Sequence, residues 1–173
     1  DEVKFEVLHP SRESYDDPSV KDNDRSCVLK IEARGGQVLL PADIERRSEE
    51  DLLRRARDDL RANVLIAPHQ GSRTSSTHDF VSAVNPQIVV FPVGYRNRFG
   101  HPHREVVHRY QDIGTKIYRT DRDGAVTIAV RVEGVISVTP YRAIYRLYWQ
   151  TQWVGDPVPD PEEFGKAMMN DDR

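Results

Sequence analysis

The chain has 173 residues, which is enough for one domain with a sizeable hydrophobic core. Hydrophobic residues make up 38% and charged residues 31%, a globular balance, and no apolar run approaches the roughly 20 residues of a membrane-spanning helix. The formal net charge of -3 excludes a globally basic nucleic-acid-binding protein, and the single cysteine excludes an internal disulfide.

The first forty residues predict three strands. These strands cover residues 5–8, 27–32 and 38–40, with a polar loop over residues 11–25. Residues 27–32 alternate between apolar and polar side chains, as a half-buried strand does. The alternation points Cys27 inward, so we expect a buried and inert thiol there. The pair Gly35-Gly36 predicts the turn between the second and third strands.

Helices and buried strands alternate in the middle of the chain. Ser48, with Asp51 three residues later, is the predicted N-cap of a helix over residues 49–60. A strand, a helix, a second strand and a second helix follow over residues 64–67, 77–84, 88–93 and 105–113. This order predicts an α/β sheet that is covered by helices.

The last part of the chain predicts a hairpin, two further strands and a tail. Residues 116–119 and 125–130 are expected to pair across the turn Asp121-Arg122-Asp123-Gly124. Gly134 separates two more strand-like runs, of which the second ends with residues 141–149. We expect one domain over residues 1–154 and an acidic, proline-containing tail over residues 155–173.

The charges are unevenly spread along the chain. A basic segment at residues 96–109 lies between acidic segments at residues 13–24 and 156–172. The first residues are acidic and mixed, so we expect no signal peptide. A membrane role is therefore expected to come from sequence outside this chain.

Two loops that follow predicted strands each carry one side chain able to bind a metal ion, Asp43 and His69. A helix and a strand lie between them, which is one crossover unit, so both are expected at the same edge of the sheet. Carboxylate and imidazole ligands suit zinc and manganese, and two such ions can activate a water and polarise a phosphoryl oxygen. The residues by themselves leave open whether Asp43 and His69 bind metal or serve as ordinary turn and loop residues.

Hydroxyl and arginine side chains beside these loops are candidates for phosphate contacts. Residues 71–76 place hydroxyls and amide donors ahead of a predicted helix, which is an arrangement that binds phosphate or simply caps the helix. Residues 94–102 combine arginines, which neutralise phosphate, with aromatic rings, which stack on bases; the alternative is a solvated loop. His101 is a candidate general acid, phosphate contact or metal ligand. The candidate phosphate contacts are Ser72, Thr74, Ser75, Arg96, Asn97 and Arg98.

Six segments of the chain, taken in order, carry a family resemblance. They cover residues 5–10, 23–31, 39–45, 67–76, 97–102 and 119–126. Together these segments resemble the carboxy-terminal metallo-β-lactamase-like domain of ComEC-type competence proteins. Those proteins are inner-membrane channels for DNA uptake in natural transformation. The resemblance extends in order from residue 4 to residue 130.

The resemblance implies an α/β fold and a metal-dependent activity. The fold is an αββα sandwich of two stacked sheets flanked by helices, and this chain would be its later part. The implied activity is phosphodiester hydrolysis that removes the non-transported DNA strand. The family's small-Gly-Asp motif falls on residues 41–43, and its Pro-His-His-Gly-Ser motif falls on residues 68–72. By that correspondence Asp43 bridges two metal ions, Zn or Mn, and His69 binds one; Asp43, His69 and His101 are the expected catalytic residues.

The chain also departs from the family pattern. Ala42 replaces the motif glycine, and Gln70 replaces the second histidine, which puts any role of that histidine in doubt. The family's His-x-His/Asp-x-Asp-His cluster is not found in this chain, and the resemblance places it before residue 1. Asp43 and His69 alone are too few ligands for a tightly bound metal. We therefore expect the chain by itself to hold no firmly bound metal pair and to be inactive.

The resemblance further implies partners and a place in the cell. The implied partners are DNA, single-stranded or duplex, the membrane-embedded channel portion of the same polypeptide, and other DNA-uptake proteins. The implied place is the periplasmic face of the bacterial inner membrane. Two other functions stay open: a non-catalytic DNA-binding module in which the basic segment at residues 96–109 guides the strand, and a metallo-hydrolase with another substrate.

Overall fold

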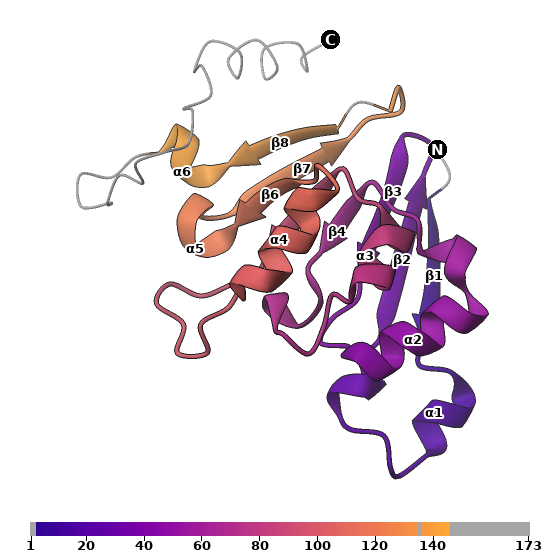
Figure 1. The fold of residues 1–173 in the computed structure, drawn as a ribbon. Coiled ribbons are helices and arrows are strands. Elements are labelled where there is room, and N and C mark those ends of the chain that lie inside the picture. Colours follow the sequence, from indigo (N-terminus) through magenta and orange to yellow (C-terminus); the bar gives the residue numbers. More distant parts are fainter. Residues whose placement is uncertain (1–2, 135, 146–173) are drawn as a thin grey trace.

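A six-stranded sheet forms the centre of the protein, and its strands lie in sequence order (Figure 1). The computed structural model describes residues 3–134 and 136–145. The strands are β1 (Lys4–His9), β2 (Val28–Ala33), β3 (Gly36–Leu40), β4 (Val64–Ile66), β5 (Ile88–Phe91) and β6 (Lys116–Arg119). Strands β1 to β3 pair antiparallel, and β3 to β6 pair parallel.

Helices cover one face of this sheet, and a separate hairpin covers part of the other (Figure 1). The crossovers between the parallel strands contain α2 (Arg46–Arg55), α3 (His78–Val84) and α4 (Arg104–Asp112). The hairpin consists of β7 (Val126–Val130) and β8 (Ile136–Pro140), paired antiparallel. The short helices are α1 (Arg12–Asp16), α5 (Thr120–Asp123), α6 (Tyr141–Ile144) and the 3-10 turns η1 (Asn23–Arg25), η2 (Arg57–Leu60) and η3 (Pro68–Gly71).

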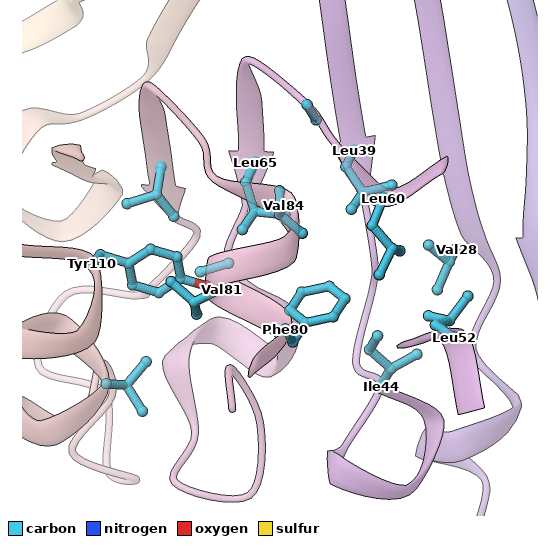
Figure 2. Close-up of a cluster of buried hydrophobic side chains, with 14 of the residues drawn as sticks. Val28, Leu39, Ile44, Leu52, Leu60, Leu65, Phe80, Val81, Val84 and Tyr110 are labelled. Carbon is cyan, nitrogen blue, oxygen red and sulfur yellow. The ribbon is translucent and has the colours of Figure 1, made fainter. Parts of the chain in front are cut away.

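The sheet is buried on both faces at its centre. Leu65, Phe80 and Leu52 belong to one buried cluster between the sheet and the helices (Figure 2). Val64 and Ile88 point the other way and pack against the hairpin. Because successive side chains of a strand alternate between faces, β4 and β5 need apolar residues at every position. This explains their continuous apolar sequences and confirms the predicted α/β class.

The end of the chain differs from the prediction. Strand β6 does not form a hairpin with β7; it pairs with β5 in the main sheet, and the expected turn forms α5. An isolated two-stranded hairpin is only marginally stable. In the large sheet, β6 instead buries Ile117 on one face and Tyr118 on the other. The predicted strand at residues 141–149 begins as α6. Residues 146–149 and the expected tail lie outside the described residues.

The first predicted helix also differs from its prediction. Helix α2 begins at Arg46, so Ser48 is inside the helix and is not its N-cap. The Ser48 hydroxyl donates instead to the buried Asp24, at 2.8 Å from Oδ1, because a buried carboxylate needs donors. Asp24 belongs to η1, and the region predicted as a polar loop therefore contains two short helices, α1 and η1. The helix ends at Arg55 and is followed by η2.

The expectation for Cys27 is wrong. The strand begins one residue later than predicted, and Val28 and Lys30 are its buried positions, while Cys27 is exposed. A shift of one residue exchanges the two faces of a strand, which accounts for the difference. Among the described residues, no helix has the length and apolar character that crossing a membrane requires.

Candidate functional site

Two loops meet at the carboxyl edge of the parallel strands β3 and β4. We call residues 41–45 and 67–76 the strand-end loops; the first carries Asp43 and the second carries His69. The backbone N–H of His69 donates to the carbonyl oxygen of Ala42 at 2.9 Å, and that of Arg46 donates to the carbonyl of Thr74 at 2.9 Å. The structure thus brings the two loops together, as the crossover between them predicts.

The strand-end loops contain several residues in the left-handed backbone region. Ala42 has φ 50°, His69 has φ 46° and Gln70 has φ 54°. Such angles are uncommon for residues other than glycine, cost about 1–2 kcal/mol each, and tend to cluster at functional sites. Gly71 follows at φ 81°, where a Cβ would lie 2.7 Å from the Phe91 ring. In the sequence, the one signal of this strain is at Ala42, where the motif of the family that the chain resembles has a glycine.

The His69 side chain lies among polar and ionisable groups. Its Nδ1 atom is 3.4 Å from Glu45 Oε1, and its ring centroid is 5.9 Å from that of His101 in an edge-on arrangement. Within the described part of the chain, Nδ1 of His69 and Nδ1 of His101 are buried without a hydrogen-bond partner. Nδ1 of His101 thus lies without a hydrogen-bond partner beside an imidazole whose own Nδ1 faces a carboxylate oxygen, although buried polar atoms are normally satisfied.

His101 comes from the loop before α4, and its surroundings favour the neutral imidazole. Burial, and then the neighbouring His69 and His103, lower the pKa of His101, while the nearby Asp43 carboxylate opposes that shift. The structure therefore gathers Asp43, His69 and His101, the three predicted catalytic residues, into one region. A neutral imidazole has one nitrogen with a free lone pair, which can accept a proton or bind a metal ion.

Glu45 is a member of this region that the sequence analysis missed. Its Oε1 atom accepts from the Thr74 hydroxyl at 3.1 Å and lies close to His69. The Ser72 hydroxyl lies 3.0 Å from that of Thr74. Glu45 is only two residues after Asp43, and that proximity to a candidate residue was the available signal. Because Thr74 already has these partners, its predicted phosphate contact stays a prediction.

Ser75 holds the second strand-end loop in shape. It is buried, and its hydroxyl donates to the carbonyl oxygen of Pro68 at 2.9 Å and lies 3.0 Å from that of Ser72. The side chain thus closes the loop on itself and does not cap α3. Its predicted phosphate contact has no support in this geometry and stays a prediction.

A buried polar network lies beneath the same loop. The Glu49 carboxylate accepts backbone N–H groups from Ser76 and from Thr77, the latter at 2.8 Å. Burial raises the pKa of Glu49, and these hydrogen bonds oppose the shift. Tyr110 donates its hydroxyl to Ser76 at 3.0 Å, and Arg109 donates to the Ser76 carbonyl at 2.7 Å. Arg109, at the end of the predicted basic segment, therefore supports the loop.

The loop at residues 94–101, which we call the aromatic loop, ends at His101. Arg96 and Arg98 are exposed, as a phosphate contact requires. The Asn97 side chain instead bonds within the loop: it donates to the carbonyl of His101 at 2.7 Å and accepts the backbone N–H of His101 at 2.9 Å. The Phe99 ring centroid is 5.9 Å from that of His101.

The described residues do not supply a complete metal centre. No group of three or more His, Cys, Asp or Glu side chains within residues 3–134 and 136–145 could hold a metal ion. Structural and catalytic zinc sites use three or four protein ligands, so Asp43 and His69 fall short even with the free nitrogen of His101 close by. A complete metal site would therefore need ligands from outside the described residues.

No family model matches the chain, but it is similar to parts of several longer proteins. It is 36% identical over 150 residues to Competence protein ComA of Neisseria gonorrhoeae, covering 87% of this chain and 21% of that protein. It is 31% identical over 156 residues to the uncharacterized protein YcaI of Escherichia coli (strain K12), covering 90% and 20%. It is 30% identical over 140 residues to ComE operon protein 3 of Bacillus subtilis (strain 168), covering 80% and 17%. The chain thus spans about a fifth of the length of these relatives, and their names support a competence-protein family.

Proposed function

We propose that this chain is part of a nuclease-type domain of a ComEC-family DNA-uptake protein, where it hydrolyses or handles incoming DNA. Similarity to Competence protein ComA and to ComE operon protein 3 supports the proposal. The observation that carries it is the bond from the His69 N–H to the Ala42 carbonyl, which joins the two motif loops at one edge of the sheet. Two side chains that are able to bind a metal ion, Asp43 and His69, thereby come to one edge from separate motifs. His101 lies beside His69.

The proposed fold is the later part of a metallo-β-lactamase-like αββα sandwich. Helices, the large sheet and the β7–β8 hairpin form three successive layers, and the hairpin would belong to the second sheet of the sandwich. The proposed cofactors are divalent ions, Zn or Mn, with Asp43 and His69 as ligands and the further ligands outside the described residues. Such ions, if held there, would supply a nucleophilic water to phosphodiester hydrolysis. Arg96 and Arg98 neutralise phosphate, and neutral His101 is able to accept a proton.

The proposed partners are DNA, the membrane-embedded portion of the same polypeptide and other DNA-uptake proteins. The proposed location is the periplasmic face of the bacterial inner membrane, where incoming DNA arrives. The resemblance supplies these assignments, and the names of the relatives support a role in competence. The exposed arginines of the aromatic loop support DNA as a partner, because arginine neutralises phosphate.

Cleavage of labelled DNA by the full-length protein in Mn²⁺ or Zn²⁺ tests the proposal. We expect Asp43→Ala and His69→Ala each to reduce the cleavage rate by about 100-fold or more, with DNA binding retained. Glu50→Ala, an exposed acidic residue on α2, is the matched control and should leave cleavage unchanged. Cleavage that persists in both site variants would contradict the roles given to Asp43 and His69.

A non-catalytic DNA-binding module is the second candidate. The exposed Arg96 and Arg98, which can neutralise phosphate without any metal, favour it. This candidate predicts no cleavage by the full-length protein, but salt-sensitive DNA binding that weakens in Arg96→Ala and Arg98→Ala. Cleavage of other phosphodiesters without cleavage of DNA would instead indicate a metallo-hydrolase with another substrate.

A further inference from the structure

The aromatic loop exposes two rings that a folded protein ordinarily buries. The side chain of Tyr95 is 68% exposed, and that of Phe99 is 63% exposed. The loop joins β5 to α4 and projects from the body of the protein at the lower left of Figure 1. Single exposed apolar residues are common on protein surfaces, but two aromatic rings in a five-residue stretch call for an explanation.

An arginine stacks beside each of these rings. The guanidinium carbon of Arg96 is 5.2 Å from the ring centroid of Tyr95, and that of Arg98 is 4.9 Å from the centroid of Phe99. Each pair thus combines a flat π surface with a positive charge. A nucleotide offers the complementary groups, a flat base and a negative phosphate, whereas an apolar peptide offers no charge for the arginines.

The loop is held at its base, so the rings are presented on a fixed support. The Asn97 side chain makes two hydrogen bonds to the backbone of His101 and lies 3.4 Å from the Gly94 carbonyl. The backbone N–H of Asn97 also donates to that carbonyl at 3.2 Å. Preorganisation of this kind lowers the entropy cost of binding a ligand.

The rings are continuous with the candidate catalytic region. Phe99 lies 5.9 Å from His101, centroid to centroid, and His101 lies 5.9 Å from His69. A base stacked on Phe99 would therefore lie close to His101, at the edge that carries the strand-end loops. These ring contacts run from the exposed Phe99 through His101 to His69.

We propose that Tyr95 and Phe99 form a stacking platform for unpaired nucleobases, through which this edge of the protein selects single-stranded over duplex DNA. The inference rests on the proposed function in DNA handling. Bases within a duplex already stack on one another and reach a protein ring only after unstacking, whereas bases of a single strand are free to do so. Arg96 and Arg98 contact phosphate in either form, so they add affinity without this discrimination.

Binding of the full-length protein to a labelled oligothymidine strand and to a duplex of the same length tests the platform. We expect the double variant Tyr95→Ala/Phe99→Ala to bind the single strand about tenfold or more weakly, with duplex binding unchanged. The variant Tyr95→Phe/Phe99→Tyr keeps both rings and should retain the preference. Tyr15→Ala removes a ring that is 64% exposed on α1 and serves as the matched control.

The arginines give an internal comparison. Arg96→Ala/Arg98→Ala should weaken the binding of both DNA forms and flatten the dependence of affinity on salt. Unchanged single-strand binding in the ring variant, or equal loss for both DNA forms, overturns the platform. If Asp43→Ala abolishes cleavage while the ring variant behaves as wild type, the platform fails and the proposed function stands. If the wild-type protein binds neither DNA form, both fail.

Discussion

The strand-end loops and the aromatic loop lie side by side at His101, but they are held in different ways. Beneath the strand-end loops, the buried Glu49 and Tyr110 bond to residues 76–77 and fix the loop at its end. In the aromatic loop, one asparagine side chain ties the loop to His101, and the rings on either side are exposed. The first arrangement fixes the positions of individual atoms, as chemistry requires. The second presents a surface, as the contact with an extended ligand requires.

The strongest test of this difference removes the buried carboxylate. Glu49→Ala leaves two backbone N–H groups near Ser76 and Thr77 without their acceptor and should lower the free energy of unfolding by about 2–4 kcal/mol. Urea unfolding followed by circular dichroism measures the change. Glu50→Ala, the exposed neighbour, should change it by less than about 0.5 kcal/mol. Equal effects of the two variants would show that Glu49 does not hold the loop.

A glycine exchange compares the two regions directly. A Cβ at Gly71 would lie 2.7 Å from both Phe91 and Pro102, so Gly71→Ala should cost about 1–3 kcal/mol in unfolding free energy. A Cβ at Gly94, in the aromatic loop, meets no atom within 4 Å. Gly94→Ala should therefore be close to neutral in the same thermal or urea unfolding measurement. A neutral Gly71→Ala would mean that the packing around this loop relaxes easily.

The pH dependence of stability should reveal Glu49 as well. Burial raises the pKa of this carboxyl in the folded protein, so the folded state binds more protons than the unfolded state over the interval between the usual and the raised value. The contribution of Glu49 to stability is then fully present below the usual pKa of a glutamate and is lost as the pH rises through the raised value. Urea unfolding across this interval should show that the free energy of unfolding depends less steeply on pH in Glu49→Gln than in the wild type. Parallel curves for the two proteins would refute the assignment.

In contrast to the losses expected at Glu49 and Gly71, we expect a small gain in stability at Ala42. Its φ of 50° suits glycine, so Ala42→Gly should raise the free energy of unfolding by about 0.5 kcal/mol, after the entropy cost of a glycine. Ala129→Gly, at an exposed position of the regular strand β7, should lower it by about 0.5–1 kcal/mol. Differential scanning calorimetry can resolve two shifts of opposite direction. A loss of stability in both variants would show that Ala42 is not strained.

The smallest change in stability is expected at Asn97. Its hydrogen bonds lie near the surface, so Asn97→Ala should cost only about 0.5 kcal/mol in unfolding free energy. The preference for single-stranded DNA should nevertheless decrease, because the rings lose their fixed support. Paired stability and binding measurements separate the two effects. An unchanged preference would show that the rings do not depend on the asparagine.

The sequence predicted the parts of the fold that depend on local patterns. Continuous apolar runs identified the buried strands β4 and β5, and the crossover between Asp43 and His69 predicted that their loops share an edge. The partner of β6 was missed, because pairing in a sheet depends on burial against distant residues such as those of β5. The start of α2 was missed because the buried Asp24, from another segment, engages the Ser48 hydroxyl.

For the candidate site, the sequence indicated which residues to consider but not what surrounds them. Motif residues gave Asp43 and His69, but Glu49 looked like an ordinary residue in the first turn of a helix, and its burial comes from packing that no local pattern records. The proximity of His101 to His69 depends on the path of the chain between β5 and α4. A local stretch of sequence shows which side chains are present, whereas the whole fold determines what surrounds each of them.

The bond that joins the two motif loops runs from one main chain to the other, from the His69 amide to the Ala42 carbonyl. A contact of this kind does not depend on which side chains the two positions carry. The loops can therefore keep their mutual position while the residues on them are exchanged. Gln70, directly after His69, stands at such a position. A single substitution there can change the chemistry of this edge while the two loops keep their arrangement.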